Sequence, residues 1–221
     1  MIRAIVAIIA EILLFGACLF GAAGSLAWPM AWAVLGIYSI LKAAALAFLD
    51  PDLIRERVSP GPGVDRGDVL LATLGVLTLY PVTFTVAGLD AVRFGPYLPM
   101  ADVIQVAGLL VYAFGYGFAY WAAFSNPFFA TFVRIQQDRG HSVVSSGPYA
   151  LVRHPGYAGV LLAHLALPFA FESILTLLPT ALAVLLFVAR TSREDQTLRD
   201  HLAGYIDYQA RVRWRLLPGV W

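Results

Sequence analysis

The feature that most constrains this chain is a series of apolar blocks, each about as long as a membrane is thick. The hydrocarbon core of a bilayer is about 30 Å thick, and a helix needs roughly 20 apolar residues to cross it. Blocks of this kind fall at residues 5–24, 28–49, 69–89 and 103–124. Charged residues make up only 13% of the chain, whereas soluble domains contain about 25%. The sequence therefore predicts an integral membrane protein.

The two ends of the chain extend this pattern. The N-terminal run resembles a signal peptide, but Glu11 interrupts it and a second span follows at once, so we expect a retained first helix. Residues 157–190 are apolar, contain prolines and are too few for two full perpendicular spans, so we predict a tight helical hairpin, short or partly re-entrant. Residues 191–221 are polar and are predicted to be helical through about Arg211. The predicted fold is an all-α, polytopic membrane bundle of about five to six transmembrane helices, without a Rossmann domain.

The blocks also define the organisation of the chain. Residues 1–124 hold the N-terminal transmembrane helices, and residues 125–221 hold a long polar loop, the hairpin and a C-terminal helix, all in one integrated membrane domain. Residues 50–68 are predicted to be a polar loop, because they contain a Pro-Gly-Pro-Gly breaker. Residues 132–136 and 141–144 flank a turn, and we expect them to form a short β-hairpin.

Positive charges indicate how the chain is oriented. Six helices place both termini on the same side of the membrane. Of the 15 Lys and Arg residues, only Arg93 falls on the opposite side. Because positively charged loops stay in the cytoplasm, we expect both termini and the long loop to be cytoplasmic. We expect the protein to lie in a bacterial inner membrane.

The polar stretch at residues 140–157 precedes the hairpin and ends in the sequence RHPGY at residues 153–157. One interpretation places Arg153 and His154 among lipid headgroups. The other uses the free N–H groups at the start of a helix, beside Arg153, to bind a carboxylate or a phosphate. These residues alone leave both interpretations open.

A second polar group follows the hairpin. Arg190 and Glu194 lie four residues apart, so they share one face of a helix. They form either a surface salt bridge or a functional pair at the membrane interface. The four histidines lack metal-ligand spacing and Cys18 is the only cysteine, so no metal site is expected.

Two features inside the spans favour packing over function. Gly115 and Gly117 follow no strand and open no helix, so they predict close contact between helices instead of a dinucleotide site. His164 lies in the middle of an apolar helix, and we expect it to be a hydrogen-bonded packing residue.

The ordered polar motifs of the C-terminal half resemble those of a known family. They are GPY at residues 147–149, RHPxYxG at 153–159, RxxxEDxxL at 190–198, GY at 204–205 and YxxRV at 208–212. This set is similar to the C-terminal half of isoprenylcysteine carboxyl methyltransferases. Related bacterial membrane methyltransferases and phospholipid N-methyltransferases share the pattern. The resemblance covers about residues 126–221, and the first three helices match only as hydrophobic spans.

The resemblance implies a site for S-adenosylmethionine between the long loop and the last helix. The residues implied for this cofactor site are His141, Val144, Gly147, Tyr149, Arg153, His154, Tyr157, Glu194 and Asp195. Arg190 and Glu194 are the implied catalytic residues. Arg190 would position an acceptor carboxylate, and Glu194 would hold the amino group of the cofactor or orient Arg190. The second glutamate of the family is Asp195 here, and the spacing from Leu198 to Gly204 is a residue longer, which leaves the acceptor geometry open.

The chemistry of methyl transfer suits so small a set of polar residues. The cofactor brings the reactive group, and the reaction is an in-line displacement. A carboxylate acceptor is ionised at neutral pH and needs no general base, whereas an amine or thiol would need His154 or Glu194 to remove a proton. This favours a carboxylate or an intrinsically reactive thiol.

Two other functions fit the sequence. One is an NADPH-dependent membrane reductase of the sterol C14 reductase type, which has a similar C-terminal half. The other is a non-catalytic lipid-binding membrane protein. We expect a lipophilic or lipidated substrate and membrane lipids as partners, and no nucleic acid. The sequence leaves the acceptor open among a prenylated cysteine, a phospholipid amine, a fatty acid and a thiol, and it leaves the oligomeric state open.

Overall fold

The computed structural model describes residues 1–221, and its regular elements are all helices. The α-helices are α1 (Ile2–Ala23), α2 (Pro29–Phe48), α3 (Pro51–Val58), α4 (Arg66–Leu77), α5 (Thr83–Gly88), α6 (Asp102–Ser125), α7 (Pro155–Ala170), α8 (Leu177–His201) and α9 (Tyr205–Arg211). Two π-helical segments lie at Thr78–Val82 and Leu89–Arg93. Short 3-10 turns lie at Gln137–Arg139, Gly147–Ala150 and Ile174–Thr176.

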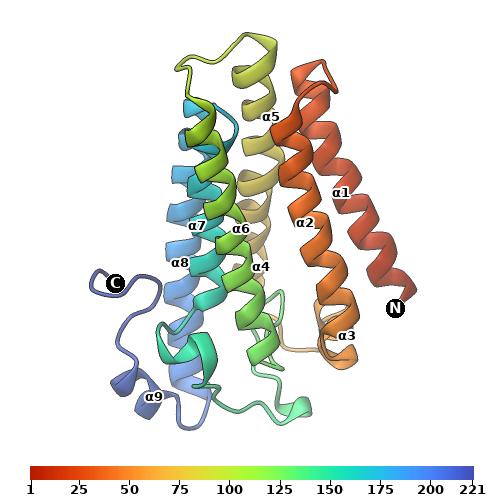
Figure 1. Ribbon diagram of the computed structural model, residues 1–221. Coiled ribbons are helices and arrows are strands. Elements are labelled where there is room, and N and C mark those ends of the chain that lie inside the picture. The colour runs from red at the N-terminus through yellow and green to blue at the C-terminus, as the bar shows by residue number, and fades with distance from the viewer.

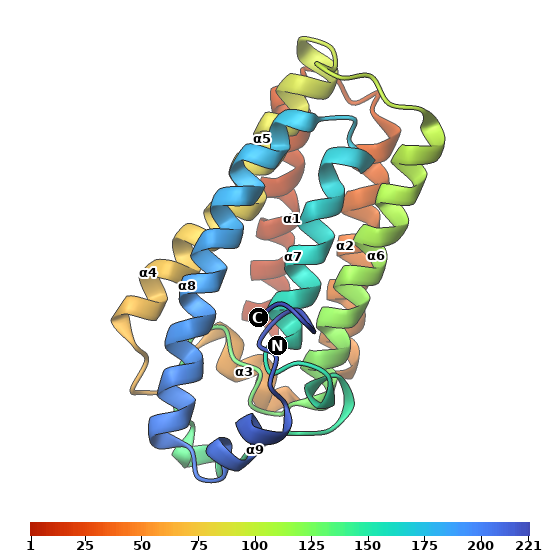
Figure 2. The same ribbon diagram turned by 90° about the vertical axis from the view of Figure 1, so that its left-hand side faces the viewer.

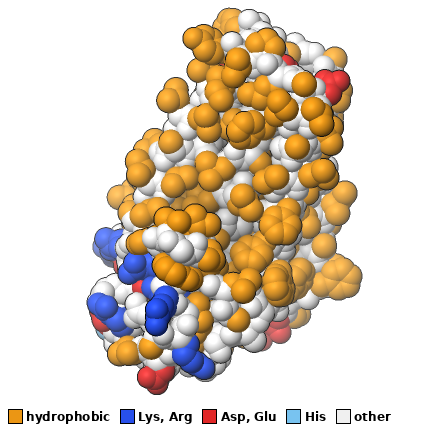
Figure 3. Space-filling model, turned by 60° about the vertical axis from the view of Figure 1, so that its left-hand side comes forward, with side chains coloured by type: hydrophobic (Ala, Val, Ile, Leu, Met, Phe, Trp, Pro, Cys, Tyr) orange, Lys and Arg blue, Asp and Glu red, His pale blue; other side chains and the backbone are white.

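Five helical segments are long and apolar enough to cross a membrane. They are Ile2–Ala23, Pro29–Phe48, Arg66–Arg93, Asp102–Ser125 and Ile174–His201, and α7 is a shorter apolar helix. These helices run side by side in one bundle, with α3 and α9 at the same end (Figures 1 and 2). On the face shown in Figure 3, apolar side chains cover the body of the bundle, and Lys and Arg gather at the end that holds α9. The prediction of a polytopic helical membrane bundle is confirmed.

The two chain ends lie in the same half of the bundle, the half that also holds α3 and α9 (Figure 1). Arg93 ends the third span at the opposite end, where its Nη1 donates to the carbonyl oxygen of Ala22 at 3.4 Å. The charge asymmetry predicted from the sequence is therefore present in the folded chain.

The third span is continuous from Arg66 to Arg93, although Pro81 lies inside it. Proline has no N–H to donate, so it interrupts the regular helical ladder. The backbone widens to a π-helix over Thr78–Val82, and the hydroxyl of Thr83 donates to the carbonyl oxygen of Thr78 at 2.9 Å. The helix therefore continues past the proline.

Residues 50–68 are not the plain loop that was predicted, because they contain α3. The side chain of Asp50 caps this helix by accepting the N–H groups of Asp52 at 2.8 Å and Leu53 at 3.2 Å. Pro51 occupies the first helical position, where a missing N–H costs nothing.

The β-hairpin predicted for residues 132–136 and 141–144 is wrong. The turn between them is a 3-10 turn that ends at Gly140, whose φ of 67° lies in the left-handed region. The first segment hydrogen-bonds elsewhere: the N–H of Val133 donates to the carboxylate of Asp68 at 2.7 Å. This segment is therefore hydrogen-bonded to the first turn of α4 and not to a second strand.

The helical hairpin predicted for residues 157–190 is present as α7 and α8. Only its first arm is short: Ile174–His201 is long and apolar enough to cross a membrane, so the prediction of a short or re-entrant hairpin is wrong for the second arm. Helix α8 continues into the polar region as far as His201. The chain then turns, with Gly204 at a φ of 79°, before α9 begins. The helix predicted to run through Arg211 is therefore interrupted between α8 and α9.

Helices α6 and α7 are in backbone contact along their glycines. A Cβ atom at Gly115 would lie 2.6 Å from the backbone nitrogen of Ala163, and one at Gly108 would lie 2.6 Å from that of Ala170. A Cβ atom at Gly159 would lie 2.4 Å from the carbonyl oxygen of Gly115. A Cβ atom at Gly117, in contrast, would have no atom within 4 Å apart from its own stretch of helix. Close packing is therefore confirmed for Gly115 and not for Gly117.

These two glycines give a matched pair of substitutions. We expect Gly115→Ala to lower the free energy of unfolding by about 1–3 kcal/mol, because backbone atoms of α7 cannot move aside. We expect Gly117→Ala to be neutral or to stabilise by up to about 1 kcal/mol through helix propensity. Thermal unfolding of both variants in one detergent measures the difference, and equal melting temperatures would contradict it.

Candidate functional site

A narrow cavity of about 100 Å³ lies at the polar end of the bundle, where the loop between α6 and α7 meets α8 and α9. Its wall contains seven of the residues implied for a cofactor, namely His141, Val144, Tyr149, Arg153, His154, Tyr157 and Glu194. Gly147 and Asp195 do not line this cavity. We call it the loop cavity.

A larger cavity of about 640 Å³ lies within the bundle. Of its 31 wall residues 24 are hydrophobic, so it suits a lipophilic molecule. Sites for small molecules typically have volumes of about 300–1,000 Å³. We call it the apolar cavity. The two cavities share the wall residues Phe129, Ala130, Phe132, Gly156 and Tyr157, so they meet at the start of α7.

Tyr157 connects the two cavities through its contacts. Its hydroxyl donates to Oε2 of Glu194, which lines the loop cavity, at 2.5 Å. The guanidinium carbon of Arg190, which lines the apolar cavity, lies 5.1 Å from the centre of the Tyr157 ring. The ring of His154 is parallel to that of Tyr157 at 5.9 Å. One side chain therefore contacts a carboxylate on one side and a guanidinium on the other.

Arg190 forms no salt bridge with Glu194, one of the two arrangements that helical spacing left open. Its Nε and Nη2 donate to the two oxygens of Asp68 at 2.7 and 3.0 Å, and Nη2 also donates to the carbonyl oxygen of Thr131 at 2.6 Å. Helical spacing identified two residues on one face, but each finds a partner on another element: Asp68 of α4 for Arg190, and Tyr157 of α7 for Glu194. In Arg190 only Nη1 makes no hydrogen bond within the chain.

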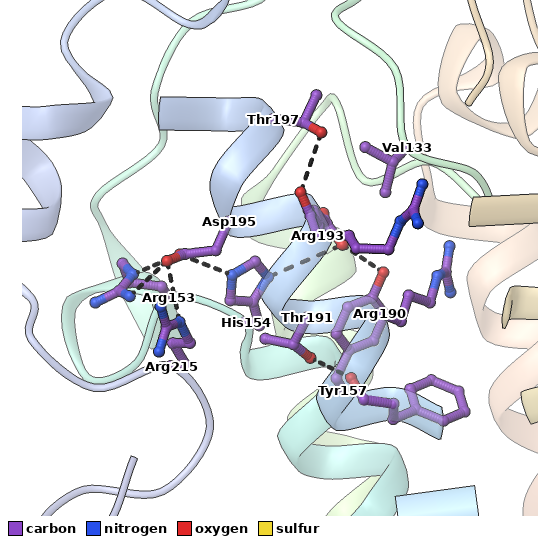
Figure 4. Close-up of polar contacts among 12 residues, drawn as sticks. Val133, Arg153, His154, Tyr157, Arg190, Thr191, Arg193, Asp195, Thr197 and Arg215 are labelled. Atoms are coloured by element: carbon purple, nitrogen blue, oxygen red, sulfur yellow. Dashed lines mark hydrogen bonds and ion pairs between the residues drawn. The ribbon is translucent and has the colours of Figure 1, made fainter. Parts of the chain in front are cut away.

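Asp195 is the centre of a buried network that ties the C-terminal segment to the hairpin (Figure 4). Its oxygens contact Arg153 at 2.8 Å twice, Nε2 of His154 at 3.2 Å, the hydroxyl of Tyr205 at 2.7 Å, Arg215 at 3.0 Å and Gln209 at 3.4 Å. Because both oxygens are occupied within the chain, this geometry supports a structural role for Asp195 and no direct contact with a ligand.

Arg153 belongs to the same network. Besides Asp195, its guanidinium donates to the carbonyl oxygens of Val212 at 2.9 Å and Arg213 at 2.7 Å. The side chain is only 3% exposed. The interpretation that placed Arg153 among lipid headgroups is therefore wrong. Its charge-assisted donors are also already used within the chain, so little of the guanidinium is left to bind an anion.

The loop that forms the first cavity is anchored to α3 by charge. Nε and Nη2 of Arg134 donate to the two oxygens of Glu56 at 2.6 and 2.8 Å, and Nη1 donates to Asp138 at 2.7 Å. The hydrogen bonds from Arg134 lower the pKa of the Glu56 carboxyl group below its ordinary value. The pair therefore stays ionised and fixes the loop against the N-terminal half of the chain.

His141 lies in this loop as a neutral imidazole. Burial, together with the positive charges of Arg134 and Arg139, lowers its pKa from 6.5 to about 4. Its Nδ1 accepts the N–H of Gln136 at 3.2 Å, and its ring lies 4.5 Å from that of Phe128. The neutral form therefore supports the fold of the loop.

The apolar bundle with a polar loop at one end defines a polytopic helical membrane protein. A comparison with known protein families matches residues 108–200 to the isoprenylcysteine carboxyl methyltransferase family. The match runs from α6 to the last turn of α8, a little under half of the chain, and includes Tyr149, His154, Tyr157 and Glu194. It confirms the resemblance drawn from the motifs and supports a membrane methyltransferase. A comparison with curated proteins finds no match.

Sequence reasoning missed several residues that shape the site. They are Asp68, which holds Arg190; Glu56 and Arg134, which anchor the loop; and Phe129 and Phe132, which line both cavities. Asp68 follows the N-cap Asp65 at the start of a span, where a carboxylate is common because it interacts favourably with the helix dipole. Nothing in the local sequence distinguishes it from such a residue.

The Asp195 network gives a first test of the site. We expect Asp195→Asn to lower the free energy of unfolding by about 3–5 kcal/mol, because Arg153 would remain buried without a counter-charge. Residues 202–221 should also become more sensitive to trypsin. Thermal unfolding and limited proteolysis measure both effects. Asp200→Asn is the control, since Asp200 is exposed on the same helix. If the two variants behave alike, Asp195 does not hold this segment.

His141 gives a pH-dependent test. Because its pKa is lower in the folded chain, the unfolded chain binds the additional proton between about pH 6.5 and 4. This contribution to stability is complete above pH 6.5 and is lost as the pH falls towards 4. We expect His141→Gln to lose less thermal stability over this range than the unsubstituted protein does. His201→Gln, at an exposed histidine, is the control and should leave the pH dependence unchanged.

Proposed function

We propose that this chain is a methyltransferase that uses S-adenosylmethionine and acts on a lipophilic acceptor. The observation that carries the proposal is the meeting of a polar and an apolar cavity at Tyr157, within the segment matched to the methyltransferase family. The loop cavity is the candidate site for the cofactor, and the apolar cavity is the candidate site for the acceptor. The reaction most like that of the family is O-methylation of a carboxylate.

The side chains of the loop cavity fit such a cofactor. The carboxylate of Glu194 suits an ammonium or sulfonium group, and the rings of Phe128, Tyr149 and His141 offer flat surfaces for a base. A cavity of about 100 Å³ is smaller than the roughly 300 Å³ or more of typical ligand sites. A bound cofactor would therefore need more room than the loop cavity has in this structure.

The residues where the two cavities meet would promote the reaction by positioning the two reacting groups. S-Adenosylmethionine supplies the methyl group as an electrophile when it is bound. Tyr157 and Phe129 would hold the two reacting groups in line and keep water out of the junction. Nη1 of Arg190, which is free of partners in the chain, would orient the acceptor from the side of the apolar cavity. None of these roles requires a general base when the acceptor is a carboxylate.

The alternative functions receive less support. Both arginines in the wall of the loop cavity, Arg134 and Arg153, are paired with carboxylates of the chain. Neither is available for the additional phosphate of NADPH, so a reductase is not favoured. The family match also favours a transferase over a non-catalytic lipid-binding protein. We further propose that the end with α3 and α9 faces the cytoplasm of a bacterial cell, where a soluble cofactor reaches the loop.

Binding of S-adenosylhomocysteine to the detergent-purified protein tests the proposal directly. We expect saturable binding by calorimetry, and transfer of label from methyl-labelled cofactor to a lipophilic molecule when membranes are incubated with the protein. Absence of saturable binding would overturn the proposed function.

A substitution of Glu194 tests whether this residue belongs to the cofactor site. Glu194→Gln keeps an oxygen that accepts the Tyr157 hydroxyl but removes the negative charge. We expect affinity for S-adenosylhomocysteine to fall by about tenfold or more, because a hydrogen bond to a charged group is worth about 1.5–3 kcal/mol. The melting temperature without ligand should change little. The exposed Asp200→Asn is the control, and unchanged affinity in Glu194→Gln would remove Glu194 from the cofactor site.

A further inference from the structure

Arg57 of α3 is a charged residue that neither the fold nor the proposed cofactor site accounts for. It lies in the wall of the apolar cavity and outside the segment matched to the family. Its Nη1 donates to the carbonyl oxygen of Phe129 at 3.0 Å, and its guanidinium carbon lies 5.2 Å from the centre of the Phe129 ring. These contacts place Arg57 beside a residue that lines both cavities.

The guanidinium of Arg57 has most of its donors unused. Of the five N–H groups of an arginine, only one has an acceptor in the chain. No carboxylate lies within salt-bridge distance of it. The Arg57 side chain is partly buried. Removal from water lowers the pKa of its guanidinium, although an arginine remains charged at neutral pH. A charge held partly out of water in an apolar wall is costly without a partner, so such groups are ordinarily paired.

The other charges in the same wall are all compensated. Lys42 pairs with Glu11 at 2.8 Å, and Arg190 pairs with Asp68 at 2.7 Å. Arg57 is therefore the one cation of the apolar cavity that has no carboxylate within salt-bridge distance, since the nearby Glu11 pairs with Lys42. An occupant of the cavity that carried a negative charge would supply a counter-charge, while its apolar part filled the rest of the space.

We infer that Arg57 is an anion-binding residue of the apolar cavity and that the occupant is an amphiphile with one anionic group, a carboxylate or a phosphate, on an apolar chain. The inference rests on the proposed function, because it defines the acceptor class for that site. The position of Arg57 beside Phe129 puts the anionic group at the junction of the two cavities, where methyl transfer would occur.

This placement has a chemical consequence when the anion is a carboxylate. A carboxylate oxygen would form a bond to the methyl carbon as the bond from that carbon to the sulfonium sulfur breaks. An anion and a cation thus give a neutral ester and a neutral thioether, with no proton to remove. The ester no longer attracts Arg57, so substrate is held more tightly than product. If the acceptor were instead an amine beside a phosphate diester, methylation would leave the negative charge of the phosphate in place. Arg57 would then not distinguish substrate from product.

Binding of simple amphiphiles to the full-length protein in a non-ionic detergent tests the inference without any methyl transfer. The probes are dodecanoate, its methyl ester and dodecyl phosphate. We expect saturable binding of dodecanoate, of dodecyl phosphate or of both, and at least about tenfold weaker binding of the ester. The anion that binds identifies carboxylate or phosphate as the group recognised.

Variants of α3 decide whether Arg57 is responsible. We expect Arg57→Gln to reduce affinity for the anion to the level of the ester while leaving ester binding unchanged, and Arg57→Lys to keep part of the preference. Arg55→Gln is the matched control, since Arg55 lies on the same helix, has 76% of its side chain exposed and is absent from the cavity wall. A melting temperature for each variant identifies loss of folding, and Arg57→Lys then carries the test.

Two results would overturn the inference: equal affinity of the unsubstituted protein for acid and ester, or full anion affinity in Arg57→Gln. Neither result would affect S-adenosylhomocysteine binding, which tests the proposed function separately. Conversely, Arg57-dependent anion binding without cofactor binding would leave a site for an anionic amphiphile in a protein that is not a methyltransferase of this kind.

Discussion

At the polar end of this bundle, charged side chains lie where the chain leaves an apolar layer, and each buried charge there needs a partner of opposite sign. Three bidentate ion pairs meet this need: Arg190 with Asp68, Arg134 with Glu56, and Arg153 with Asp195. They join residues that are 122, 78 and 42 positions apart in the chain. The pairs thereby fix the loop between α6 and α7 against α3, α4 and α8, and the two cavities exist because this loop is held there.

The same pairing separates structural charges from those available to a ligand. The polar atoms of Asp195 and Arg153 form hydrogen bonds within the network that holds the C-terminal segment. Glu194 and Tyr157 bind each other but face the loop cavity, and Arg57 has no carboxylate partner. The polar motifs of one continuous stretch therefore serve different purposes, and only their contacts distinguish them.

Much of the fold was predictable because a membrane imposes a length on apolar helices. The four long blocks and the hairpin were predicted from hydropathy, although Pro81 allowed the third span to continue as a π-helix. The predicted β-hairpin was wrong because Val133 hydrogen-bonds to Asp68, a partner that local sequence does not reveal. The salt bridge between Arg190 and Glu194, which helical spacing left open, is absent for a similar reason: helical spacing describes one helix, and both residues bond to other helices.

The sequence by itself determined the class of fold, the charged end of the bundle and the segment similar to a methyltransferase family, since each depends on composition or on residues close together in the chain. Tertiary structure alone decided which carboxylate each arginine binds, that Tyr157 lies between two cavities, and that Arg57 has no carboxylate within salt-bridge distance. The physical reason is that a buried charge is satisfied by whichever group the packing of the helices brings within about 3 Å, and that group lies far away in sequence.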